Sequence, residues 1–318
     1  MREIGGFSVQ PVTAENLSEL FRRESALEEA RVCELADCAR RAVGYVGELL
    51  GGGMDLAEAL SLLSDGLVFP AGVPDGAALA ECEPLLRVHG GMLSRLDRLA
   101  FCRLFCREAV GAGCFRSVGD FFAEGLVPET FVYVRNAFAD EAYDVFSGEF
   151  SRPTVHYAAS LREAVGEVAD GVTSYALLPL EERGGVRIPT VEEFLLQNEL
   201  HITGITPVFG LDGRADLKYA MVSKNFRVPV AEADDDLYFE FLVGKDSEPQ
   251  LSEILSAAEG AGAEVYRVHT LHLVSSEGES SYFSVIVKKS AGDFLVLWLY
   301  LFLFAPAFIP IGMYKNLE

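Results

Sequence analysis

The chain has 318 residues and 50% of them are hydrophobic, which allows two or three folded domains and excludes an intrinsically disordered protein. Its 48 acidic and 26 basic residues give a formal net charge of −22 at pH 7. Such a surface repels nucleic-acid phosphates and anionic membranes, so neither class of partner is expected. The first residues contain no apolar core typical of a secretion signal, and we therefore expect a cytoplasmic location.

Residues 1–127 are expected to form a helical domain whose role the sequence does not indicate. Apolar residues recur at helical spacing over 35–50, and three glycines at 51–53 end that helix. Asp55 and Glu58 form a capping-box start for a second helix, and a further apolar helix is predicted over 93–110. The six cysteines all lie in this region, at positions 33, 38, 82, 102, 106 and 114.

The cysteines are expected to be buried, unreactive thiols. They contain no C-x-x-C pair. Cys102 and Cys106 lie one helical turn apart and could share a metal, but Phe101 and Phe105 beside them indicate an ordinary core face. We therefore expect neither a metal nor another cofactor.

Short strands and helices alternate over residues 128–231. Strands are predicted at 131–134, 154–157, 174–178 and 200–203, and two of the helices between them are predicted to begin at the capping residues Ser160 and Thr190. This order is typical of a mainly parallel, Rossmann-like α/β lobe covered by helices. The loop predicted at 179–187 follows the most apolar strand, and open α/β sheets bind ligands at the carboxyl ends of their strands.

That loop supplies most of the candidate ligand-binding residues. Glu181, Glu182 and Arg183 could bind or polarise an anionic ligand, and Arg187 would add positive charge. Lys218, on the next predicted strand, could pair with a carboxylate. The alternative interpretation is a solvated loop with weak surface ion pairs. Catalytic residues stay unknown, because a nucleophile and its base meet only in space.

An acidic linker at 231–236 precedes a C-terminal domain, predicted over 236–318. Its predicted order βαββαβ is the split-βαβ arrangement. The stretch 294–314 is uncharged, but Pro306 and Pro310 limit its helix to about 12 residues, whereas about 20 are needed to cross a bilayer. This helix is apolar on every side and needs a second covering surface, either another subunit or the N-terminal helices. We expect a homodimer through this domain.

Two stretches of the sequence carry a family resemblance. SYALLPLEERGGVRIPTVEEFL at 174–195, followed by ELHITG at 199–204, is similar to the strand, Pro-Ile-Glu-Asn-Ser loop, helix and next strand of prephenate dehydratases. FADEA at 138–142 is similar to the helix start after the glycine-rich first loop of that family. The resemblance over 129–318 implies a periplasmic-binding-protein-like dehydratase lobe followed by a C-terminal ACT-like regulatory domain.

The positions that carry the chemistry of that family differ here. Glu182 and Arg183 stand in place of its amide and hydroxyl, and the first loop is shortened, which leaves Arg135 and Asn136 as candidate ligand contacts. Leu217 takes the place of the catalytic threonine, and a leucine side chain cannot donate a proton. The residues between 206 and 216 are also too few for the second lobe of the family.

The resemblance and these differences lead to three hypotheses. The first is a catalytically degenerate dehydratase-like protein of phenylalanine metabolism, which senses a small aromatic or carboxylate ligand as a regulatory homo-oligomer. The second is an active dehydratase, a lyase converting prephenate to phenylpyruvate, whose cleft is completed by the N-terminal region. The third is a non-catalytic interaction scaffold.

Overall fold

The computed structural model describes residues 14–68, 93, 95–122, 128–209, 215–229, 236–275, 278–290 and 293–317. The helices are α1 (Ala14–Gly51), α2 (Leu56–Val68), α4 (Arg95–Ala112), α5 (Ala137–Ser147), α6 (Leu161–Ala169), α7 (Pro189–Gln197), α8 (Leu251–Gly260) and α9 (Leu295–Phe304), with the 3-10 helix η1 (Val118–Phe121). The strands are β1 (Thr130–Tyr133), β2 (Thr154–Tyr157), β3 (Tyr175–Glu182), β4 (Val186–Arg187), β5 (His201–Phe209), β6 (Ala215–Ser223), β7 (Leu237–Gly244), β8 (Glu264–Ser275), β9 (Gly278–Lys289) and β10 (Ile309–Lys315).

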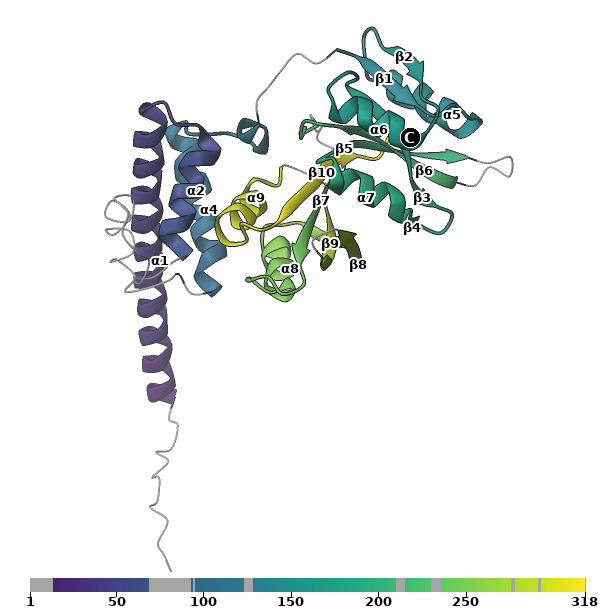
Figure 1. Cartoon of the computed structure of the whole chain (residues 1–318). Coiled ribbons are helices and arrows are strands. Elements are labelled where there is room, and N and C mark those ends of the chain that lie inside the picture. Colours follow the sequence, from purple (N-terminus) through teal and green to yellow (C-terminus); the bar gives the residue numbers. More distant parts are fainter. Residues whose placement is uncertain are drawn as a thin grey trace, which may run out of the picture.

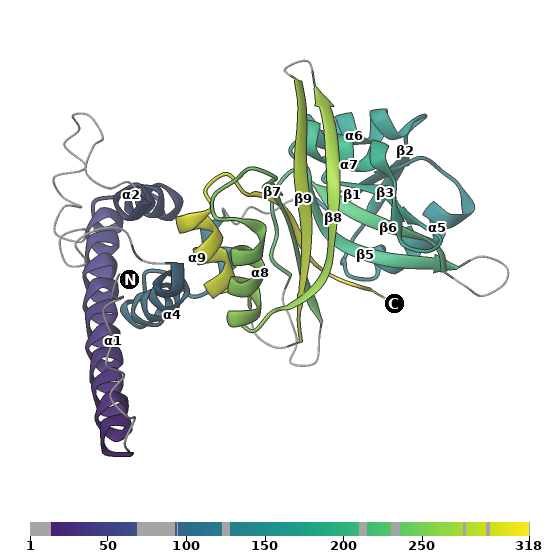
Figure 2. The same ribbon diagram turned by 90° about the horizontal axis from the view of Figure 1, so that it is seen from below.

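These strands form one mixed sheet that runs through both halves of the C-terminal two thirds of the chain (Figures 1 and 2). The strand order is β2-β1-β3-β6-β5-β10-β7-β9-β8, with β4 paired to the end of β3. The prediction of a mainly parallel lobe is correct for β1, β2 and β3 but wrong for β6, which runs antiparallel to both β3 and β5. Strands β5 and β6 are close in sequence, and such neighbours pair as antiparallel strands.

The last four strands have the predicted split-βαβ topology. In the sheet they follow the order β10-β7-β9-β8, and α8 and α9 supply the two helices of the βαββαβ chain order. Strand β10 also pairs in parallel with β5, through Gly312 and Ile202. The α/β half and the split-βαβ half are therefore joined edge to edge by a backbone contact that the sequence did not predict.

Apolar clusters lie on both faces of this sheet. Helix α5 packs with Phe131, Leu177 and Tyr219 on one face of the α/β half. Helices α6 and α7 cover the other face, in a cluster that continues onto Leu242 and Ile286 of the split-βαβ half. Helices α8 and α9 cover the opposite side of that second half. The α7 face is thus shared by both halves.

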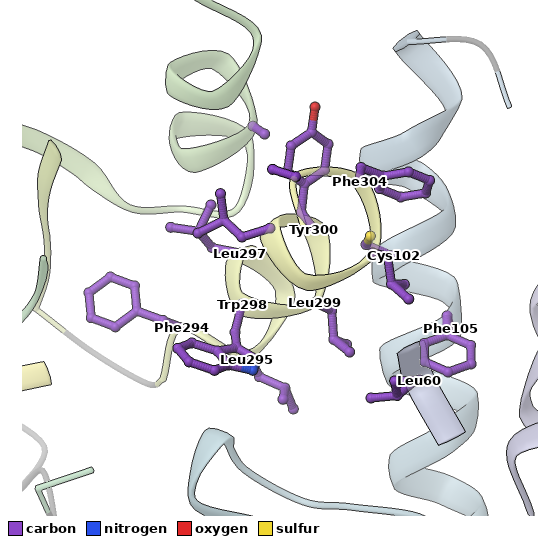
Figure 3. Close-up of a cluster of buried hydrophobic side chains, with 14 of the residues drawn as sticks. Leu60, Cys102, Phe105, Phe294, Leu295, Leu297, Trp298, Leu299, Tyr300 and Phe304 are labelled. Carbon is purple, nitrogen blue, oxygen red and sulfur yellow. The ribbon is translucent and has the colours of Figure 1, made fainter. Parts of the chain in front are cut away.

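Helix α9 is buried between the sheet and the N-terminal helices (Figure 3). The Trp298 ring lies 5.5 Å from the Phe239 ring of β7, and on the other side Phe304 meets Phe101 of α4 edge-on at 6.4 Å. Ser64 of α2 also donates a hydrogen bond to the Leu303 carbonyl. The second surface that this helix needs therefore belongs to the same chain, so the apolar character of α9 no longer argues for a dimer.

No helix in the described parts of the chain is both long enough and apolar enough to cross a membrane. Helix α1 differs from the prediction, because it begins at Ala14 and its N-terminal half extends beyond α2 and α4 (Figure 1). The predicted cap of α2 is confirmed, since Asp55 accepts a hydrogen bond from the Glu58 backbone at 2.8 Å. Thr190 does not cap α7, whose N-cap residue is Ile188.

The described cysteines only partly follow the expectation of buried thiols. Cys38 and Cys102 are buried, Cys106 and Cys114 are half-buried and Cys33 is exposed, while Cys82 lies outside the described residues. Burial raises the pKa of Cys106 to about 11, with Asp293 adding to the effect. The described residues hold no group of three His, Cys, Asp or Glu side chains placed to bind a metal ion.

We expect Gly312→Ala to separate β10 from β5. A Cβ at this position would lie far inside van der Waals contact with the Ile202 carbonyl oxygen and 2.8 Å from Ile202 Cβ, so the strands would have to move apart. Urea unfolding should show a loss of about 3 kcal/mol, as for overpacked cores. The control is Gly47→Ala in α1, where no atom lies within 4 Å of the added Cβ and a gain of about 0.5 kcal/mol is expected. Equal stability of the two variants would contradict the role of Gly312.

Candidate functional site

The structure separates the predicted ligand-binding residues into three places. They are Arg135 and Asn136 after β1, Glu182 and Arg183 at the end of β3, and Glu181, Arg187 and Lys218 on β3, β4 and β6. Only the last three come together, and they lie on the α7 face of the sheet rather than in a loop.

Arg135 and Asn136 stabilise the start of α5. Asn136 is its N-cap residue, and the side-chain oxygen accepts a hydrogen bond from the Ala139 backbone at 3.0 Å. The Tyr219 hydroxyl donates a second, longer hydrogen bond to the same oxygen at 3.4 Å. The exposed Arg135 guanidinium lies 4.9 Å from the centre of the Tyr157 ring. These contacts explain both residues as a helix cap and its exposed neighbour.

Glu182 and Arg183 are exposed where the chain turns from β3 into β4. Gly184 and Gly185 follow with φ angles of 91° and 78°, which L side chains rarely adopt. This tight turn allows β4 to pair back onto β3, with Arg187 opposite Glu181. The segment 179–187 is thus a strand, a turn and a short return strand, and not the open loop that the sequence predicted.

Strand pairing places three charged groups side by side. Glu181 lies opposite Arg187 of β4 on one side and opposite Lys218 of β6 on the other. Glu181 Oε1 is 3.1 Å from Arg187 Nε, and its Oε2 is 3.2 Å from Lys218 Nζ. Glu181 and Arg187 are buried, with side chains only 4% and 7% exposed. A buried carboxylate therefore meets two cations within the α/β half.

The split-βαβ half adds two charged residues that sequence reasoning missed. Arg267 Nη1 of β8 is 2.7 Å from Glu181 Oε1, and it also donates to the Gly185 carbonyl at 3.1 Å. Glu240 Oε2 of β7 is 2.7 Å from Arg187 Nη2. The signal for Glu240 was visible as a single acidic residue in the otherwise apolar strand LYFEFLVG. We name these five residues the junction network: Glu181, Arg187, Lys218, Glu240 and Arg267.

Hydrogen bonds complete the inner end of the junction network. The hydroxyls of Tyr314 on β10 and Ser284 on β9 donate to the two oxygens of Glu240, at 3.0 and 3.3 Å. Next to it, His269 Nε2 of β8 lies 3.0 Å from Glu192 Oε1 of α7. The network thus connects strands from both halves of the sheet.

The surrounding charges favour the ionised forms of Glu181 and Arg187. Burial alone would raise the pKa of Glu181, but Arg187, Lys218 and Arg267 outweigh it and the pKa is lowered. Burial would lower the pKa of Arg187, but Glu240 and the other acidic groups around it raise it instead. A carboxylate held in its ionised form by three cations is poorly suited to donate a proton. The junction network is therefore suited to holding structure or recognising charge rather than to acid catalysis.

Two buried donors of the junction network, Arg187 Nε and Nη1, make no hydrogen bond in the described chain, and Nε lies 3.1 Å from Glu181 Oε1 in an ion pair. Arg187 borders a cavity of about 10 Å³ that Glu192, Glu240 and Ser284 also line. A cavity of this size with polar walls can hold one water molecule.

We expect Glu181→Gln to reduce the free energy of unfolding by about 3 kcal/mol, because the variant leaves buried cations without their counter-charge. A double-mutant cycle with Arg187→Gln, followed by urea unfolding, should give a coupling energy above about 1 kcal/mol. The control cycle uses Glu19 and Arg23, an exposed pair at 2.6 Å in α1, for which about 0.5 kcal/mol or less is expected. Equal coupling in the two cycles would show that the junction network is not a specific contact.

The stabilising effect of Glu181 should also depend on pH. Its folded pKa lies below the ordinary value of 4.5, so the unfolded chain takes up a proton first. The stability difference between the native chain and Glu181→Gln should be constant above about pH 4.5 and should shrink as the pH falls further. Guanidinium unfolding at several pH values measures this, with exposed Glu259→Gln as the control. A difference that grows in acid would contradict the lowered pKa.

Solved structures similar to this chain carry two kinds of name. A prephenate dehydratase from Streptococcus mutans is 12% identical, with 60% of this chain and 100% of that chain covered and a TM-score of 0.46. A protein described as a novel type of quorum-quenching acylase is 18% identical, with 59% and 95% covered and a TM-score of 0.43. A prephenate dehydratase from Arthrobacter aurescens in complex with L-Phe is 13% identical, with 58% and 89% covered and a TM-score of 0.40.

No protein-family model matches the chain, and no curated protein matches it. Likenesses to solved structures this low in identity and TM-score concern the fold, and no activity is inferred from them.

Proposed function

We propose that the chain is a non-catalytic, dehydratase-like protein of aromatic amino-acid metabolism, which responds to a small aromatic or carboxylate ligand instead of converting it. The observation that carries this proposal is that the Glu181 carboxylate is fully engaged in ion pairs. This residue is the one acidic position of the family loop that the sequence retains, and its carboxylate is occupied by Arg187, Lys218 and Arg267. Because its charge is neutralised by these three cations, the Glu181 carboxylate stabilises the structure, which fits a protein that no longer catalyses a reaction.

The neighbouring strand supports the same proposal. Leu217 stands where the resemblance implies a catalytic threonine, and in the structure it lies on β6 opposite Glu182. Its alkyl side chain can neither donate nor accept a proton. Strands β5 and β6 pair directly with each other, at the point in the chain where the family would insert a second lobe. At the described positions of β5 and β6, neither a hydroxyl in place of Leu217 nor an inserted lobe is present, which supports the proposal.

The described N-terminal helices do not support the alternative of a rebuilt active cleft. Helices α2 and α4 pack on α9, and α1 packs on α4. In Figure 1 these three helices lie at the opposite end of the molecule from β1 and β2. Helices α1, α2 and α4 therefore do not form one side of a cleft at the carboxyl ends of β1, β2 and β3.

A homodimer through the split-βαβ half, in the cytoplasm, is part of the proposal. Its support is the outer strand β8, which ends the sheet and exposes 48% of Tyr266 and 37% of Val268. An edge strand offers backbone hydrogen-bonding groups to another strand, and apolar side chains on it favour such pairing.

The proposal predicts that purified protein forms no phenylpyruvate from prephenate at neutral pH above the uncatalysed rate, measured by the absorbance of phenylpyruvate. In a thermal-shift screen, a ligand that binds the native state should raise stability by about 2.7 kcal/mol at a hundredfold excess over Kd. Phenylalanine, phenylpyruvate and prephenate are the compounds to compare.

Glu181→Gln is the informative control for the turnover measurement. Turnover by the native chain that disappears in a folded Glu181→Gln variant would make Glu181 catalytic and would overturn the proposal. The absence of turnover in both proteins, together with a thermal shift by one of the compounds, is the expected result.

A further inference from the structure

A hollow of about 510 Å³ lies where the two halves of the sheet meet. It is bordered by α7, by the first residues of β5 and β10, and by Tyr282 of β9. Its apolar lining consists of Leu195, Leu196, Leu200, Ile309, Pro310 and Ile311. Ligand sites favour junctions of this kind, because two packed units leave a concave apolar surface between them.

The polar groups around this hollow are mainly hydrogen-bond acceptors. Glu193 and Glu199 are exposed carboxylates, and Gln197 donates to Glu193 at 2.8 Å, which turns its own donor away from a ligand. None of the described residues that line the hollow is a lysine or an arginine. With a formal net charge of −22 on the whole chain, the hollow favours a cation over an anion.

His201 adds no positive charge to the lining of the hollow. Its Nδ1 is 3.0 Å from the Pro310 carbonyl oxygen, and a carbonyl can only accept, so Nδ1 carries the proton. Burial lowers the pKa of His201, although Glu199 and the Pro310 bond oppose this, and the ring is neutral at pH 7. The neutral ring packs edge-on against Phe226 at 5.3 Å.

The hollow shares its inner wall with the junction network. Leu195, Leu196 and Ile311 line both the hollow and the 10 Å³ cavity at Arg187. The Arg187 side chain is only 7% exposed, and its Nη1 has no acceptor in the described chain. A molecule seated in the hollow would press on the residues that enclose this unpartnered donor. The hollow and the cavity at Arg187 therefore share three lining residues.

We propose that this hollow binds an apolar amine, with its hydrocarbon body on Leu196 and Ile309 and its ammonium group at the Glu193 and Glu199 carboxylates. This site is separate from the one that would respond to phenylalanine, phenylpyruvate or prephenate, and its binding does not rest on the function proposed above. A carboxylate on the ligand weakens binding, since it would meet two carboxylates and no cation.

Isothermal titration calorimetry of the full chain with three matched probes tests the site. The probes are 2-phenylethylamine, L-phenylalanine and 3-phenylpropanoate, which share a phenyl ring and differ in their charged groups. The amine should bind in the millimolar range or tighter, at least about tenfold more tightly than phenylalanine, and 3-phenylpropanoate should give no heat of binding.

Variants separate a specific site from general attraction to an acidic protein. The double variant Glu193→Gln/Glu199→Gln should weaken binding of 2-phenylethylamine by about tenfold or more. The matched control, Glu259→Gln/Glu264→Gln, removes the same charge from exposed positions outside the hollow and should leave Kd unchanged. Thermal unfolding of both variants checks that they are folded.

The outcomes distinguish this inference from the proposed function. No binding of 2-phenylethylamine, equal binding of the three probes, or an equal loss in the two double variants would overturn the amine site. Formation of phenylpyruvate would overturn the proposed function and would leave the amine site standing.

Discussion

The buried ion pair between Arg187 and Glu240 is the contact on which the arrangement of the sheet depends. It joins β4 to β7 at 2.7 Å, so each half of the sheet supplies one charge. A buried charge that loses its partner destabilises the fold by several kcal/mol. Neither half can therefore move away without leaving Arg187 or Glu240 buried and unpaired. The close approach of Gly312 to Ile202 lets the backbones meet at the same junction. The Arg187–Glu240 ion pair and the absence of a side chain at Gly312 together hold the two halves in place.

The same pairing changes the chemistry of the strand end. In open α/β sheets the carboxyl ends of strands are free to meet ligands, but here Glu181 and Arg187 are turned into the contact with β7 and β8. Their charges form ion pairs within the protein instead of binding a charged substrate. An open concave surface, the hollow beside α7, has Glu193 and Glu199 in its lining and no described lysine or arginine. Glu181 and Arg187 are therefore engaged in the junction network, and the proposed amine site lies at the boundary between the halves.

Local signals in the sequence predicted the element order well. Asp55 and Ser160 cap their helices through hydrogen bonds to residues three positions later, as their spacing indicates. The junction network could only be predicted in part, because Glu181 and Arg187 are near in sequence whereas Glu240 is 53 residues from Arg187 and Arg267 is 86 from Glu181. Such contacts depend on which strands become neighbours. The antiparallel placement of β6 and the joining of β5 to β10 were missed for the same reason.

The surface that covers helix α9 could not be predicted from the sequence, for a physical reason. Apolar residues on every side require two covering surfaces, but burial against another subunit and burial against the same chain remove equal apolar area from water. The pattern therefore could not choose between a dimer and the N-terminal helices. In the structure, Phe101 and Ser64 of the N-terminal helices contact α9, so the second covering surface belongs to the same chain. The N-terminal helices and the split-βαβ half consequently share one core, in which α9 lies between the N-terminal helices and the sheet that carries the junction network.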